Sequence, residues 1–182
     1  MAYLLRTLIL IMFLSILLTI GLALGVLHIQ NFSHIKVAIP SFIYTIFAQA
    51  FVMFYFIGVA RLVDNVRTIL SSEQNLSELF DQVPPDLKPY RAKVQRFHHE
   101  AELCKRQTIP WTMLMLILGM IAFLLGAAHD TGMVKKHIHS GVVYGFLAAM
   151  VIGFFRQWYY LGKSHVLLRQ LKSLFQIPDG QM

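Results

Sequence analysis

Five of the eight histidines in the chain gather in two short stretches, one of which also carries a carboxylate. Neutral imidazoles and carboxylate oxygens are ligands that zinc, copper and iron accept. A site of this composition would suit a metal-dependent enzyme or a component of a transporter. The sequence therefore predicts a candidate transition-metal site from six residues: His28, His34, His129, Asp130, His137 and His139.

Two of these histidines end a repeated segment, Leu24-Gly25-x-x-His28 and Leu125-Gly126-x-x-His129. Axial ligation of haem needs two imidazoles on opposite sides of the macrocycle, and small residues beside them leave room for the flat ring. A second hypothesis is therefore a b-type haem in an electron-transfer subunit, with His28 and His129 as axial ligands and Gly25 and Gly126 beside the ring. The basic side chains available to the propionates are Lys135 and Lys136.

A third hypothesis gives the histidines no ligand. They are then hydrated groups at an outer surface, and the protein is a non-catalytic accessory subunit. Faces of small residues on its helices would bind lipids and the helices of partner membrane subunits. The sequence leaves these three hypotheses open.

The elements that must position the histidines are apolar runs. Hydrophobic residues make up 57% of the chain and charged residues only 14%, with a mean hydropathy of +0.60. Crossing the hydrocarbon core takes about 20 helical residues, and unpaired backbone groups in lipid exclude open strands. The sequence therefore predicts an all-α integral membrane four-helix bundle with spans at 8–27, 37–60, 109–128 and 140–162.

The segment that contains His28 and the segment that contains His129 lie 101 residues apart. The same register matches Thr7 with Thr108, Met12 with Met113, and Ile16 with Ile117. This similarity predicts two related transmembrane hairpins, residues 1–60 and residues 108–182, the second of which ends in a cytoplasmic tail after residue 162. The first and third spans then lie diagonally across the bundle. His28 and His129 would then face each other at the same depth.

The distribution of charge predicts the orientation. The net charge is +7, and thirteen of the sixteen lysines and arginines fall at the N-terminus, in the connection 61–107 or after residue 155. By the positive-inside rule both termini and this connection are cytoplasmic, in a multi-pass protein of the inner or plasma membrane. Because basic residues flanking spans are ordinary, the excess charge is not a sign of nucleic-acid binding.

The connection 61–107 is expected to be a cytoplasmic helical hairpin. Residues 61–82 extend the second span as a helix that Ser71-Ser72 could interrupt, and residues 88–107 form a helix that runs into the third span. The stretch His98-His99-Glu100-x-Glu102-x-Cys104 contains metal-capable side chains, but a solvated helix surface is the better interpretation of it. The hairpin is too short for a core of its own.

Two further features concern the fourth span. Gly141, Gly145, Ala149 and Gly153 recur every four residues and predict close approach of a neighbouring helix. Arg156 is expected about a turn and a half inside the inner boundary. There it must extend its guanidinium to the interface, or contact an acidic cofactor group, a quinone or a partner subunit.

The chain carries no Walker loop, nucleophile elbow, Gly-rich dinucleotide turn or HExxH sequence. The function predicted first is therefore a small non-catalytic integral-membrane subunit of a larger complex, plausibly a respiratory or other electron-transfer complex. A haem-binding subunit and an outer-face metal-binding protein are the alternatives.

Overall fold

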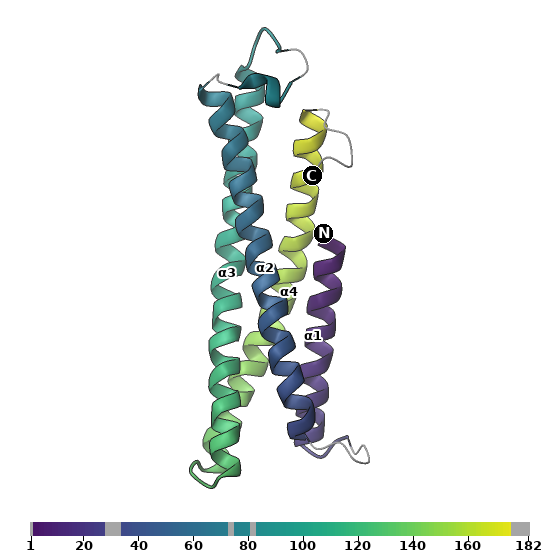
Figure 1. Cartoon of the computed structure of the whole chain (residues 1–182), viewed down its shortest axis with the longest axis vertical. Helices are drawn as coiled ribbons and strands as arrows, with labels where there is room; N and C mark the ends of the chain where they lie inside the picture. The colour runs from purple at the N-terminus through teal and green to yellow at the C-terminus, as the bar shows by residue number, and fades with distance from the viewer. Residues whose placement is uncertain (1, 28–33, 73–74, 81–82, 176–182) are drawn as a thin grey trace.

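The computed structural model describes residues 2–27, 34–72, 75–80 and 83–175. Within these residues the chain forms α-helices and one short 3-10 helix, and no strand (Figure 1). The elements in chain order are α1 (Ala2–Ala23), α2 (His34–Ser72), η1 (Leu76–Glu78), α3 (Lys88–Asp130) and α4 (Lys136–Leu174).

The helices pack as an antiparallel bundle, as predicted. Helix α1 packs against α2 and α4, and α3 packs against the same two helices. Each of α1 to α4 is long and apolar enough to cross a membrane. Large apolar side chains such as Phe47, Phe54 and Phe155 point out of the bundle. A water-soluble monomer rarely exposes apolar surface on this scale, whereas lipid would cover it.

The helices differ in length. Helix α1 has 22 residues and α3 has 43, so at 1.5 Å per residue α1 is about 33 Å long and α3 about 65 Å. A hydrocarbon core of about 30 Å accommodates α1 but only half of α3. The excess lies at one end, which we call the basic end and define as residues 61–72, 75–80, 83–107 and 163–175. The opposite end, residues 34–39 and 126–140, is the histidine end.

Both predicted extensions at the basic end are helical. Helix α2 continues to Ser72, where the paired serines suggested an interruption, and α3 runs without a break from Lys88 through Pro110. Other boundaries differ from the prediction. Helix α1 ends at Ala23 rather than at Leu27, and α2 begins at His34 rather than at Val37, with Pro40 inside the helix.

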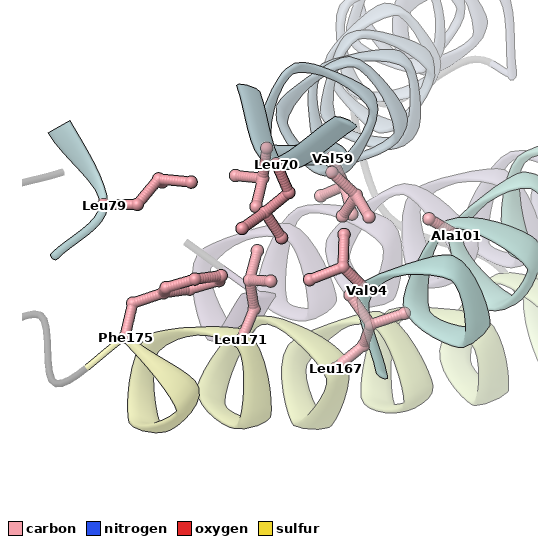
Figure 2. Close-up of a cluster of buried hydrophobic side chains, with 10 residues drawn as sticks. Val59, Leu70, Leu79, Val94, Ala101, Leu167, Leu171 and Phe175 are labelled. Carbon is pink, nitrogen blue, oxygen red and sulfur yellow. The ribbon is translucent and has the colours of Figure 1, made fainter. Parts of the chain in front are cut away.

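The basic end has an apolar core that the sequence analysis did not anticipate (Figure 2). Residues after 162 were treated as a tail, but α4 continues to Leu174 and packs beside the extensions of α2 and α3. A third helix supplies the apolar surface that a two-helix hairpin lacks. The buried side chains include Val59, Leu70, Leu79, Val94, Ala101, Leu167, Leu171 and Phe175.

The predicted 101-residue register does not describe how α1 and α3 pack. Met12 is 0% exposed, whereas its sequence match Met113 is 44% exposed. Ile16 is 6% exposed and its match Ile117 is 46% exposed. A register that pairs buried with lipid-facing positions places the two sequences on opposite helix faces. The sequence matches between these two spans are therefore not equivalences in the packed bundle.

A polar group lies at the centre of the bundle. Gln49 and Gln157 are fully buried, and Gln157 Nε2 donates to Gln49 Oε1 at 2.6 Å and to Thr112 Oγ1 at 3.0 Å. Gln49 Nε2 donates to the sulfur of Met12 at 3.0 Å. Side-chain hydrogen bonds of this kind hold neighbouring helices in register within a membrane. The group therefore ties α1 to α2, α2 to α4, and α4 to α3.

Candidate ligand-binding cavity at the histidine end

A cavity of about 610 Å³ lies between α1, α2, α3 and α4 at the histidine end. Its size is in the range of small-molecule sites. Apolar side chains form most of the walls: Ile16, Ile20, Ile39, Phe42, Phe123, Val143 and Phe146. Ionisable side chains surround the end where α2 and α4 begin and α3 finishes: His34, His129, Asp130, Lys136 and His139. The cavity therefore has an apolar body and a polar mouth.

Two imidazoles from different helices meet at this mouth. The rings of His129 and His139 have centroids 6.0 Å apart and planes 17° from parallel. His129 Nδ1 lies 3.0 Å from the carbonyl oxygen of Val134, in the turn that follows α3. This bond assigns the proton of His129 to Nδ1. Two imidazoles from separate helices therefore lie near each other in nearly parallel planes.

Gly126 makes room for the second imidazole. A Cβ at this position would lie 3.2 Å from Cε1 of His139, which is tighter than ordinary van der Waals contact. The missing side chain therefore lets the His139 ring lie directly against α3. The sequence analysis gave Gly126 a place beside a macrocycle, and in the structure the space beside it is occupied by His139.

His139 also carries an unpartnered polar atom. Its Nδ1 is buried and makes no hydrogen bond, and a buried polar atom without a partner costs about 1–3 kcal/mol. His139 lies directly before the apolar run 140–162. Burial lowers the pKa of His139, and the neighbouring His129 lowers this pKa further. The imidazole is therefore neutral at pH 7 and can exchange one hydrogen bond with a bound molecule.

The hydroxyl groups deeper in the cavity are already satisfied. Thr45 donates to the Ser41 carbonyl at 2.7 Å, and Thr19 donates to the Ser15 carbonyl at 2.9 Å. Ser41 lies 3.5 Å from the Ser15 carbonyl. The two threonine bonds run to the preceding turn of the same helix, whereas the Ser41 hydroxyl donates from α2 to α1. These three hydroxyl groups therefore need no ligand. The part of the cavity that lies deeper among the helices therefore requires no polar partner, in contrast to the mouth.

The predicted histidine residues do not all meet. His34, His129, Asp130 and His139 line the cavity, whereas His137 is exposed and is not part of its lining. His28 lies outside the described residues. Among residues 2–27, 34–72, 75–80 and 83–175, no three histidine, cysteine or carboxylate side chains are grouped closely enough to hold a metal ion. The haem ligation by His28 and His129, and a metal site that includes His28, stay predictions.

Gly25 has a different role from Gly126. Its φ is +71°, a left-handed conformation that favours glycine. The N–H of Gly25 donates to the Leu22 carbonyl at 3.2 Å, and the N–H of Val26 donates to the Gly21 carbonyl at 3.0 Å. This pair of bonds is the Schellman motif, which ends helices. Gly25 therefore terminates α1.

Arg156 has partners within the chain. Its guanidinium donates to the backbone carbonyl of Gln107 at 3.1 Å and also to the Gln107 side chain. It lies over the rings of Trp111 and Tyr160 at 5.4 and 5.9 Å. Hydrogen bonds and aromatic faces are ways to hold a guanidinium at depth without a carboxylate. Contact with a cofactor, quinone or partner is not needed to account for its position.

The metal-capable stretch of the basic end forms pairs along the helix surface. Glu100 pairs with Arg96 at 3.1 Å and Glu102 with Lys105 at 2.5 Å. His98 lies 3.6 Å from Asp64 of α2. Cys104 is fully buried beneath them. These partners agree with the interpretation of this stretch as a charged helix surface.

The small-residue ridge of α4 divides into two parts. A Cβ on Gly153 would overlap the side chain of Met115, so this glycine serves packing of α3 against α4. A Cβ on Gly141 or Gly145 would meet no atom within 4 Å. The half of the ridge nearer the histidine end, Gly141 and Gly145, is therefore open in the described part of the chain, and a partner helix could approach there.

Sequence analysis missed several residues of the cavity. Lys136 was considered only for haem propionates, and the hydroxyl side chains were not considered. A signal existed, because Ser41, Thr45 and Gln49 recur every four residues inside an apolar span and so share one helix face. In the structure Ser41 and Thr45 line the cavity, and Gln49 belongs to the central polar group.

Comparison with known proteins gives no assignment. No protein-family model, curated protein or solved structure matches the chain.

Proposed function

We propose that the protein is a small non-catalytic integral-membrane subunit that holds an amphipathic molecule in the cavity at its histidine end. The observation that carries this proposal is the cavity of about 610 Å³ between the four helices α1, α2, α3 and α4, with apolar walls and a mouth of ionisable side chains. An apolar cavity with a few converging polar groups is the best indicator of a ligand site in a protein of unknown activity.

Valine substitutions on α4 test the proposal. Val143 lines the cavity and its neighbour Val142 does not, so Val143→Trp should fill the cavity while Val142→Trp adds the same ring elsewhere. Native mass spectrometry of the protein released from detergent micelles should show a bound amphiphile in the wild type and in Val142→Trp, and none in Val143→Trp. Equal helicity by circular dichroism would show that both variants fold. Equal ligand occupancy in the two variants would contradict the proposal.

We propose an orientation with both termini in the cytoplasm, supported by the positive-inside asymmetry. The cavity then opens at the outer leaflet. In a Cys104→Ser background, Lys135→Cys should react with a membrane-impermeant maleimide added to intact cells, and Lys88→Cys only after permeabilisation. The reverse pattern would place the cavity at the inner leaflet.

We propose further that the protein assembles with other membrane subunits in a larger complex, such as an electron-transfer complex. The open half of the α4 ridge supports this, because small residues permit close helix approach. Gly141→Leu combined with Gly145→Leu should reduce the size of the complex on native gels. Gly58→Leu on α2 is the matched control, since its Cβ also meets no atom within 4 Å. An unchanged complex in the double variant would contradict this assembly surface.

A further inference from the structure

The cavity changes in polarity along its length in the same direction as one leaflet of a bilayer. Its ionisable side chains lie at the ends of α3 and α4, and its phenylalanine and isoleucine side chains lie deeper among the spans. The deeper hydroxyl groups of Thr19 and Thr45 donate to carbonyls of their own helices, and that of Ser41 donates to a carbonyl of α1. A molecule that enters from the leaflet would therefore keep its head at the mouth and its tail inside.

We infer that the occupant is a single-chain amphiphile with a carboxylate head group, bound at the mouth by Lys136 and His139. This inference rests on the proposed ligand-binding function and names the chemical class of the ligand.

The mouth offers donors that a carboxylate would satisfy. The Lys136 ammonium carries three donors and a positive charge, and the His139 ring can donate a hydrogen bond. Nδ1 of His139 is buried and has no partner in the described chain. Asp130, the one carboxylate of the lining, and Lys136 are both exposed to solvent, whereas His139 is partly buried. An anionic head group therefore complements the mouth, and charge-assisted hydrogen bonds are about twice as strong as neutral ones.

The body of the cavity fits one chain. The rings of Phe42 and Phe123 stack at 4.5 Å with planes 6° apart, and this closes the wall between α2 and α3. Phe146 of α4 reaches across to Gly119 of α3, where a Cβ would lie 3.2 Å from its ring. The remaining volume of about 610 Å³ is that of a site for one small molecule.

The experiment compares oleate with methyl oleate, which has the same tail and no charge. Each is titrated into the delipidated full-length protein in detergent, and bound ligand is measured by native mass spectrometry. We expect oleate to bind at least about tenfold more tightly, since a hydrogen bond to a charged group contributes about 1.5–3 kcal/mol. Lys136→Gln and His139→Leu should each remove most of that preference. Lys135→Gln removes the same charge from the adjacent residue, which does not line the cavity. This variant should keep the preference for oleate over methyl oleate.

The outcomes separate this inference from the proposed function. If methyl oleate binds as tightly as oleate, and Val143→Trp prevents both, the carboxylate inference is overturned while the cavity remains a ligand site. If Lys135→Gln and Lys136→Gln lower the oleate preference equally, the preference is a general effect of charge and the inference is also overturned. If neither molecule binds, both the inference and the proposed function are wrong.

Discussion

The two halves of the chain, residues 1–60 and 108–182, contain the same segment of leucine, glycine and histidine but fold it differently. In the first half, Gly25 has a φ of +71° and ends α1. In the second half, Gly126 lies within α3, which continues to Asp130. One glycine is needed for its backbone conformation, and the other for the space that its missing side chain leaves.

Both helices end in the same way but not at the same place. In α3 the Schellman bonds run from Gly132 to the His129 carbonyl and from Met133 to the Ala128 carbonyl, each at 2.9 Å. Gly132 has a φ of +76°. Relative to the repeated segment, α3 therefore ends six residues later than α1, which is about 9 Å of helix. Ala127 and Ala128 follow Gly126 and favour helix, whereas the β-branched Val26 follows Gly25.

This difference decides where the cavity lies. The extra turns of α3 bring His129 and Asp130 to the mouth, and they place Gly126 opposite His139 of α4. A short repeated segment therefore predicts similar residues, not similar depth. What each copy contributes depends on where its helix ends.

Substitutions in the central polar group should show the largest difference in unfolding free energy between the two halves of the chain. Gln157→Leu removes the partner of both Gln49 and Thr112 and should cost about 1–3 kcal/mol of unfolding free energy. Gln49→Leu should cost less, because Gln157 keeps Thr112. The double variant should be more stable than the sum of the single changes predicts, because no buried amide is then left unpaired. Denaturation in detergent micelles measures these free energies of unfolding, and additive losses would contradict the pairing of Gln49 with Gln157.

Substitution of the glycines that end helices should lower the stability of the protein by nearly as much. Gly25→Ala and Gly132→Ala each force a side chain into the left-handed region, at a cost of about 1–2 kcal/mol. Gly58→Ala serves as control, because it lies in a helix with open space around it and should be neutral or stabilising. Thermal unfolding of the three variants tests this. A stable Gly25→Ala would mean that the end of α1 does not depend on this glycine.

Gly126→Ala should change stability by less than about 1 kcal/mol, in contrast to Gly25→Ala. Alanine improves helix propensity by about this amount, while its Cβ displaces the His139 ring. The displacement should appear as a shift of the His139 ring resonances in NMR spectra and as weaker oleate binding. Unchanged His139 resonances would contradict the contact with Gly126.

If the protein binds a haem, the segments that contain His28 and His129 would both contribute a ligand to it. That hypothesis predicts sharp alpha and Soret bands in a reduced-minus-oxidised spectrum, which His28→Ala and His129→Ala should each abolish. Absence of these bands in the intact complex would remove it. Elemental analysis of the same sample for Zn, Cu and Fe tests the metal hypothesis.

The fold was predictable because apolar length and basic flanks constrain membrane helices strongly. The helical extensions at 61–72 and 88–107 were also predictable, from apolar periodicity and from the two prolines that follow Val83. The site was predictable only in part. His129 and His139 were predicted from residue type. Their contact depends on where α3 ends. Gly132, and not Gly126, terminates the helix, and the sequence does not decide between these two glycines.

The packing register was not predictable from residue matches. Leucine, isoleucine and methionine occupy lipid-facing and core positions alike in a membrane bundle, because lipid tails are as apolar as the core. Met12 and Met113 therefore looked equivalent in sequence, although one is buried and the other faces outward. Polar residues carry more information there. Ser41, Thr45 and Gln49 mark the inward face of α2.

The most direct test of the cavity is photolabelling with a fatty acid that carries a diazirine in its tail. We expect labelled peptides from all four walls, centred on Ile16, Phe42, Phe123 and Phe146, with excess oleate and Val143→Trp each preventing the labelling. Labels spread evenly over outward-facing residues such as Phe51 and Phe155, and unaffected by oleate or by Val143→Trp, would contradict a ligand site inside the bundle.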